Sequence, residues 1–83
     1  MYYVYVLWSN RQKEFYIGYT GNLERRLKEH ESGQCHTTAR MDSPKLIFYE
    51  AFTLGQEAER RESYFKTSKG KKVLRLMLQE SMK

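Results

Sequence analysis

The sequence predicts an α+β fold in which a small three-stranded antiparallel sheet is flanked by helices, in the order β-β-α-β-α-α. β-Branched and aromatic residues dominate three short segments, which is typical of strands. Three other segments carry apolar residues at helical spacing among charged ones. The strands are expected at 2–8, 14–20 and 45–52, and the helices at 23–32, 57–69 and 71–82.

The length and composition predict one small domain without a membrane segment. The chain of 83 residues is too short for two separately cored units, so residues 1–83 are expected to form a single domain. Cys35 is the one cysteine, which excludes a disulfide within the chain. No apolar run approaches the roughly 20 residues that span a bilayer. The start also lacks the pattern of a secretion signal. We therefore expect a cytoplasmic protein that acts as a monomer.

The first two strands are expected to form a hairpin. If it turns around residues 10–11, Tyr5 lies opposite Tyr16 on one face of the sheet. Tyr3 then lies opposite Gly18 on the same face, where a glycine leaves room above the backbone. The two tyrosines either pack against each other across the two strands or take part in the chemistry of the protein. The other face is apolar and is expected in the core, with Val4, Val6, Trp8, Phe15 and Ile17.

Capping residues predict where the helices begin and end. Asn22 is a good N-cap for the first helix, and Gly33 suits the position after its C-terminus. Thr53 and Gln56 have the spacing of a capping box, which predicts that they open the second helix. Gly70 is expected to separate the second helix from the third.

The middle of the chain combines a polar segment with an apolar one. Residues 34–44 are polar and end at Pro44, which predicts a loop. The strand that follows, 45–52, is apolar on both faces, so both faces are expected to be covered.

The net charge of +5 is unevenly distributed along the chain. Residues 60–83 carry eight Lys or Arg against two Asp or Glu, whereas residues 1–59 carry seven against eight. Such a basic segment either attracts polyanions or is a solvated face that keeps the protein soluble.

Two expected helices carry charged residues on otherwise apolar faces. In the first helix, Arg26 and His30 share one face with two leucines. In the second helix, Glu62 lies within an apolar stripe, where a carboxylate is costly unless it is paired or binds a metal. A salt bridge from Glu62 to Arg26, or to Lys66 one turn away, would also account for it.

Taken together, these segments resemble the GIY-YIG nuclease domain, most closely its small stand-alone bacterial members, which are often uncharacterised. The resemblance is carried by "YVY", "YIG", "GNLERRLKEH" and "AERRESYFK", and it covers nearly the whole chain. Such domains cleave phosphodiester bonds in nucleic acid with one divalent metal ion, in settings such as excision repair, homing endonucleases and restriction.

The resemblance implies a role for six residues. Tyr5 and Tyr16 match the motif tyrosines, and Gly18 closes the second tripeptide. Arg26 matches the catalytic arginine and His30 a frequent active-site histidine, while Glu62 matches the metal-binding glutamate. The chain departs from the family at two positions: Tyr3 replaces a glycine, and no Asn follows Asn22, so the role of a C-terminal asparagine is vacant or passes to a residue such as Gln79.

The chemistry of phosphodiester hydrolysis suits these residue types. A free tyrosine is about one part in a thousand ionised at pH 7, and a nearby Arg26 and a cation would favour the phenolate of Tyr5 or Tyr16 as a general base. Arg26 could also clamp a phosphate oxygen, and His30 could relay a proton or hold the phosphate. Mg²⁺ or Mn²⁺ needs few protein carboxylates, so a single ion at Glu62 is sufficient.

The predicted partner is nucleic acid, DNA in the first place, and the expected activity is that of a structure-selective endonuclease. Weak contacts to phosphates are expected from Lys66, Lys69, Lys71, Lys72 and Arg75. A non-catalytic nucleic-acid-binding module is the main alternative, and a small adaptor that binds protein through its sheet is a third. A zinc site at His30, Cys35 and His36 is disfavoured, because a fourth ligand is missing.

Overall fold

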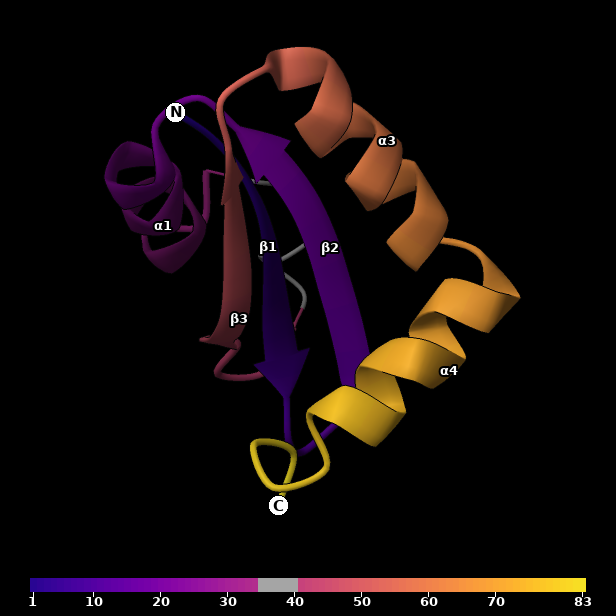
Figure 1. Ribbon diagram of the computed structural model, residues 1–83. Helices are drawn as coiled ribbons and strands as arrows, with labels where there is room; N and C mark the ends of the chain where they lie inside the picture. Colours follow the sequence, from indigo (N-terminus) through magenta and orange to yellow (C-terminus); the bar gives the residue numbers. More distant parts are fainter. Residues whose placement is uncertain (35–40) are drawn as a thin grey trace.

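Three strands form one antiparallel sheet in the computed structural model, which describes residues 1–34 and 41–83 (Figure 1). The order of the strands across the sheet is β2-β1-β3, so the first strand of the chain lies in the middle. The strands are β1 (Tyr2–Ser9), β2 (Glu14–Thr20) and β3 (Lys45–Phe52).

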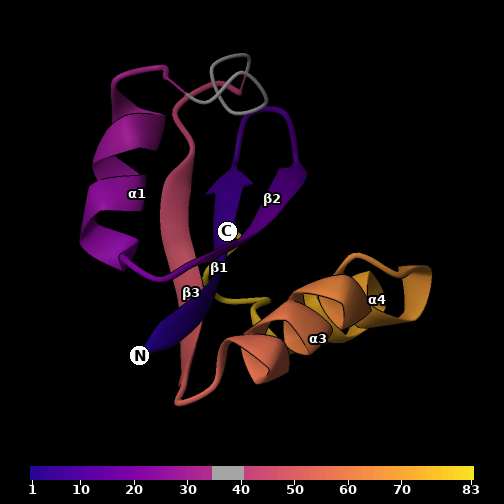
Figure 2. The same cartoon turned by 90° about the horizontal axis from the view of Figure 1, so that it is seen from above.

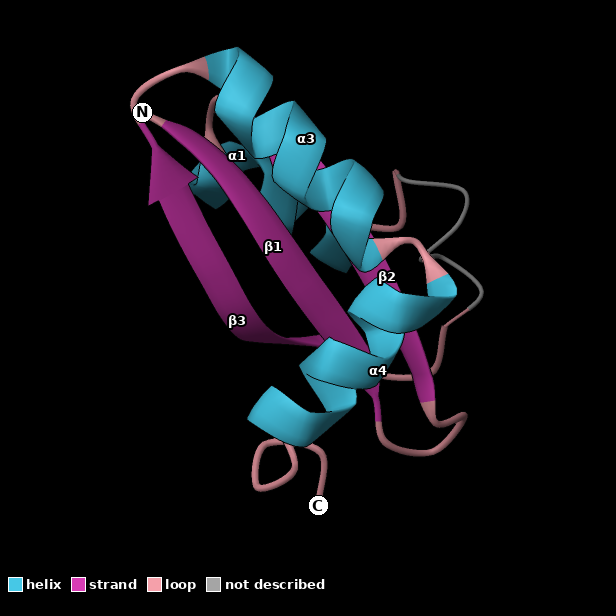
Figure 3. Cartoon of the chain, turned by 45° about the vertical axis from the view of Figure 1, so that its right-hand side comes forward, coloured by secondary structure: helices cyan, strands magenta, loops and turns pink. Residues whose placement is uncertain are grey.

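Helices lie on both sides of this sheet. Figure 2 shows α1 on one side, and α3 and α4 together on the other. Figure 3 shows the same arrangement with α3 and α4 in front of the strands. The described helices are α1 (Leu23–Glu31), α3 (Gly55–Phe65) and α4 (Ser68–Met77). The predicted α+β class and the order β-β-α-β-α-α are therefore confirmed.

The register of the β1–β2 hairpin differs from the predicted one by two residues. Tyr5 pairs with Gly18, and Tyr16 pairs with Leu7. The difference arises because a longer turn connects the strands, with Lys13 in a left-handed conformation at φ 58°. A shift of two residues keeps every side chain on its predicted face, so Tyr5 and Tyr16 still share one side of the sheet.

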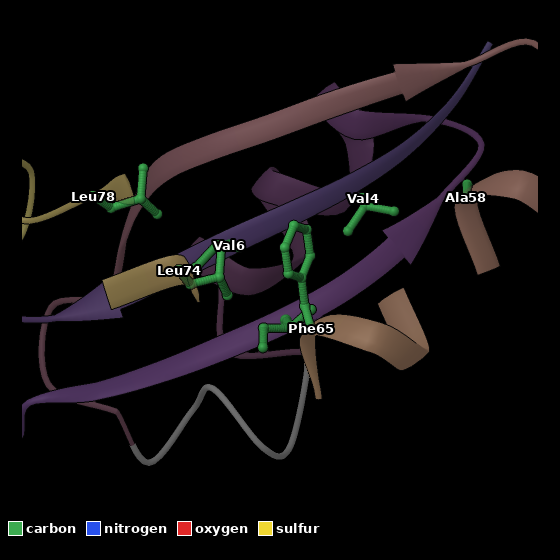
Figure 4. Packing of buried hydrophobic residues seen from close by; sticks show 7 residues of the cluster. Val4, Val6, Ala58, Phe65, Leu74 and Leu78 are labelled. Atoms are coloured by element: carbon green, nitrogen blue, oxygen red, sulfur yellow. The ribbon is translucent and has the colours of Figure 1, made fainter. Parts of the chain in front are cut away.

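The hydrophobic core lies between the sheet and the α3–α4 layer (Figure 4). Even-numbered residues of β1 point toward this layer, as predicted, and Trp8 packs on Phe15 with ring centroids 4.9 Å apart. The buried cluster consists of Val4, Val6, Ile17, Ala58, Phe65, Leu74 and Leu78. By contrast, His30 is the one fully buried residue of α1. The face toward α1 is covered differently, because its buried residues, Tyr5, Leu7 and His30, mix polar and apolar side chains.

The third strand is less covered than its composition predicts. β3 lies at an edge of the sheet, none of its residues is fully buried, and Tyr49 is 54% exposed. The prediction of two covered faces was wrong, because Tyr49 and Ala51, which pair with Tyr5 and Tyr3 of β1, remain exposed.

The predicted caps of α1 are confirmed, whereas those of α3 are not. The side chain of Asn22 accepts a hydrogen bond from the backbone N–H of Arg25 at 3.0 Å, and Gly33 follows the helix at φ 77°. In α3 the N-cap is Leu54, without a side-chain hydrogen bond, because the helix begins at Gly55, earlier than predicted. Thr53 therefore stands before the cap, and the capping box does not form.

The break between the last two helices precedes Gly70. It lies at Lys66 and Thr67, and the Thr67 hydroxyl accepts from the backbone N–H of Gly70 at 3.0 Å to cap α4. Gly70 lies inside α4, where an added Cβ would overlap the carbonyl oxygen of Tyr64 and lie 2.7 Å from Cα of Phe65. A glycine is needed here for close approach of the two helices, which a sequence pattern does not distinguish from a break.

Two further predictions concern a zinc site, which was disfavoured, and a membrane segment, which was not expected. Cys35 and His36 lie outside the described residues. Among the helices that the structure describes, none combines the length and the apolar character required to cross a membrane.

Candidate active site

The hydroxyl of Tyr5 is the centre of a polar cluster between the sheet and α1. Tyr5 projects from β1 toward α1, and its side chain is 0% exposed. Its hydroxyl lies 2.8 Å from Nε2 of His30 and 3.3 Å from Nε of Arg26. The helical spacing of Arg26 and His30 places both on the face of α1 that covers this tyrosine.

The chemistry of the guanidinium defines the direction of one hydrogen bond in the cluster. A guanidinium group only donates, so Arg26 donates to the Tyr5 oxygen. A phenol oxygen can donate as well as accept, so the direction of the hydrogen bond between Tyr5 and Nε2 of His30 depends on the tautomer of the imidazole. The pKa of His30 is lowered, first by burial and then by the positive charge of Arg26, although Glu29 raises it slightly. A neutral imidazole is therefore favoured.

Tyr16 completes the cluster from the neighbouring strand. Its ring centroid lies 6.1 Å from that of Tyr5 and 5.0 Å from that of His30, and it also interacts with the Arg26 guanidinium. Unlike Tyr5, Tyr16 is only half-buried. It is the tyrosine of the pair that reaches the surface.

Gly18 provides the space in which the Tyr5 ring lies. The two residues pair across β1 and β2, and a Cβ on Gly18 would overlap the Tyr5 ring carbon Cζ and its hydroxyl. The glycine is thus required by the neighbouring ring, since its backbone is not in the left-handed region.

Burial opposes ionisation of Tyr5, contrary to the expectation that Arg26 would favour its phenolate. The pKa of Tyr5 is raised well above its usual value of about 10, chiefly because the hydroxyl is removed from water. Arg26 lowers the pKa, but by less than burial raises it. Tyr5 is therefore a hydroxyl group at neutral pH.

Glu29 is a charged neighbour of the cluster that the sequence analysis missed. Its Oε1 accepts from Nη1 of Arg26 at 2.9 Å, and both side chains are about one-third exposed, at 31% and 34%. This contact raises the pKa of Arg26 and lowers the pKa of Glu29, so both groups remain charged. The three-residue spacing from Arg26 is a signal that the sequence contains.

Glu62 lies apart from this cluster, on α3, which covers the opposite face of the sheet (Figure 3). Its side chain is 23% exposed and pairs with Lys66 at 3.3 Å, one of the two pairings considered from the sequence. Glu62 also faces β2: burial, and then the charges of Glu59, Tyr2 and Glu62, raise the pKa of Tyr19 on that strand. No group of three or more His, Cys, Asp or Glu residues suited to a metal occurs in the described ranges.

The candidate phosphate-binding residues lie in the same layer as Glu62. Lys66 follows α3, and the other four belong to α4. All five are exposed, and the Arg75 guanidinium lies over the Phe15 ring at 5.4 Å from its centroid. Gln79 donates to the backbone carbonyl of Leu76 at 3.0 Å, so its amide closes the end of α4.

The class of this domain follows from its sequence as well as its geometry. Residues 1–75 match the GIY-YIG catalytic domain, and the chain belongs to this family. The family is a nuclease family whose members act on nucleic acid and generally depend on a metal ion.

Its relatives are small UPF0213 proteins. One from Clostridium perfringens is 37% identical, and the match covers 100% of this chain and 89% of the relative. One from Bacillus licheniformis is 45% identical over 77% of this chain and 66% of the relative. One from Natronomonas pharaonis is 38% identical over 95% of this chain and 93% of the relative. No solved structure matches the chain.

Proposed function

We propose that this protein is an endonuclease that hydrolyses phosphodiester bonds in DNA with one divalent metal ion, in the cytoplasm and as a monomer. The observation that carries the proposal is the cluster of Tyr5, Tyr16, Arg26 and His30. Three aromatic rings and one guanidinium meet there, with Tyr16 and Arg26 partly exposed, in a chain that belongs to a nuclease family.

Within this cluster, the differences in burial suggest different roles. Tyr16 is half-exposed, so we assign its phenolate form the contact with the attacking water, from which the phenolate would accept a proton and become a phenol. Arg26 is partly exposed and charged, and we assign it a non-bridging phosphate oxygen. Tyr5 and His30 are buried and hydrogen-bonded to each other. They would hold Arg26 and Tyr16 in place.

The metal ion is assigned to Glu62, and the chemistry of the donor set fits this assignment. Mg²⁺ binds through one or two carboxylates and retains waters and substrate phosphates as its other ligands. Glu62 supplies one partly exposed carboxylate in an otherwise apolar stripe of α3. A bound Mg²⁺ or Mn²⁺ would stabilise negative charge on the phosphate and on the leaving oxygen.

The position of β2 suggests how residues on both faces could act on one substrate. β2 is an edge strand, so a phosphate beside this edge can be approached from either face of the sheet. Tyr16 projects from β2 on the α1 side, and Glu62 faces Tyr19 of the same strand on the α3 side. The proposed substrate path therefore follows the free edge of β2.

Nuclease activity is tested with a panel of linear and branched DNA and RNA substrates in Mg²⁺ or Mn²⁺. The wild type is expected to cleave DNA, and Glu62→Gln to lose cleavage while it retains its fold. Glu59→Gln is the matched control, because Glu59 is an exposed residue of the same helix that also faces Tyr19. Equal activity of all three proteins would contradict the role of Glu62.

A non-catalytic nucleic-acid-binding module is the second candidate. It is favoured by the Glu62–Lys66 ion pair, which gives the carboxylate a partner without a metal. Binding without cleavage of any substrate in the panel, and with no effect of either metal, would support this candidate.

A further inference from the structure

Glu29 contacts Arg26, the residue that the proposed function assigns to a phosphate oxygen. Arg26 has three side-chain partners: Nη1 donates to Glu29 at 2.9 Å, Nε donates to Tyr5 at 3.3 Å, and the guanidinium also hydrogen-bonds with Tyr16. A planar guanidinium that is held at two of its nitrogen atoms has a defined orientation. Without the Glu29 contact, only the two tyrosines would hold the guanidinium, and the long side chain would regain part of its rotational freedom.

The negative charge of Glu29 is unfavourable beside a group that binds phosphate. A carboxylate beside a phosphate-binding arginine repels the phosphate and weakens binding of the substrate. Arg25 lies on the other carboxylate oxygen, with Nε 3.9 Å from Oε2, in a more exposed position. The unfavourable charge is retained next to the site, which is expected if the orientation of Arg26 matters more than the strength of phosphate binding.

We propose that Glu29 is a positioning residue, which fixes the Arg26 guanidinium against Tyr5 in the orientation that stabilises the reacting phosphate. The proposal rests on the proposed function for its consequence in catalysis. The contact itself can be tested without any enzymatic activity.

The first test measures the Arg26 side chain by NMR. In the wild type, the Nε–H of Arg26 is expected to give a protected resonance at neutral pH, because it is hydrogen-bonded to Tyr5. Glu29→Ala should remove this resonance or shift it to the position of a mobile arginine, and Glu29→Gln should retain it, since the amide oxygen can still accept. An unchanged resonance in Glu29→Ala would overturn the proposal.

The second test separates kcat from KM on a cleaved DNA substrate. Glu29→Ala should lower kcat about tenfold, because the misplaced group acts in the transition state, and should lower KM to the same extent as Glu29→Gln, because both variants remove the carboxylate. Glu29→Gln should keep kcat and lower KM up to about threefold, since the repulsive charge is gone. Equal kcat values for wild type and Glu29→Ala would overturn the proposal.

Two controls distinguish a positioning role from a general effect. Glu24→Ala removes an exposed carboxylate of the same helix, which pairs with Lys28 at 3.7 Å, and should change neither measurement. In an Arg26→Ala background, Glu29→Ala should have no further effect on the residual rate. If the wild type cleaves nothing, the proposed function is wrong, and the NMR measurement still decides whether Glu29 orients Arg26.

Discussion

Gly18 lies directly across the hairpin from Tyr5, and a methyl group at Gly18 would occupy the position of the Tyr5 ring. Gly18→Ala should therefore displace the ring and destabilise the fold by about 1–3 kcal/mol, as overpacking does in other cores. The free energy of unfolding in urea measures this effect.

Gly21→Ala provides the matched control. Its added Cβ would lie 3.8 Å from the Tyr2 ring, which is an ordinary van der Waals contact. This variant should be as stable as the wild type or slightly more stable. A similar loss of stability in both variants would show that glycine conformation, and not the space for Tyr5, is responsible.

The two tyrosines should respond differently to removal of the hydroxyl. Tyr5→Phe takes a partner from buried His30 and should reduce stability by about 1–3 kcal/mol. Tyr16→Phe should reduce stability by no more than about 1 kcal/mol, because Tyr16 is half-buried. In the proposed mechanism, Tyr16→Phe lowers kcat about 100-fold or more. Loss of activity without loss of stability in Tyr5→Phe would reverse this assignment.

Stability should fall at mildly acidic pH because of His30. Its pKa is lower in the folded protein than in the unfolded chain, so the unfolded state binds the proton first as the pH falls. The contribution of His30 is therefore complete above its unfolded pKa of about 6.5. It is lost as the pH falls through the folded value, by no more than about 1.4 kcal/mol per pH unit.

Thermal unfolding between pH 7.5 and pH 5 measures this dependence. His30→Gln should be less stable at pH 7.5, and its stability should change less over this interval. The lowered pKa of Glu29 acts in a more acidic range, since a carboxylate titrates near 4.5 in the unfolded chain. A steep change that persists in His30→Gln would assign the transition to another group.

Binding to DNA should depend on salt and hardly on sequence. If about three of the five basic residues contact phosphates, log K should fall with log salt with a slope of roughly −3. Replacement of Lys71 and Lys72 by Ala should flatten the slope and weaken binding to all sequences alike. Tight, salt-insensitive binding confined to one short sequence would contradict a phosphate-binding role for α4.

Local patterns in the sequence predict most of the sheet and of the α1 face. The alternation in β1 and β2 assigns Tyr5 and Tyr16 to one face, and helical spacing brings Arg26 and His30 to them. The two-residue error in register did not alter this result, because side chains in strands alternate with a period of two.

Other features depend on contacts between distant segments and could not be predicted in this way. The burial that raises the pKa of Tyr5 results from α1 lying over the sheet, which no local pattern reports. Gly70 has the appearance of a helix breaker, although its position is dictated by the approach of α3. Glu62 was grouped with the cluster by resemblance alone, whereas its helix packs on the opposite face.

The burial of His30 against Tyr5 determines how a substrate trap for this protein should be built. Only His30 of α1 is fully buried, and it is held by Tyr5, so variants at either residue loosen the helix as well as the site. An inactive variant at either position would have an altered binding surface, and the nucleic acid that it captures would differ from the native ligand. Glu62→Gln alters α3 instead, and a bait based on it should keep α1 attached and retain the native ligand for sequencing.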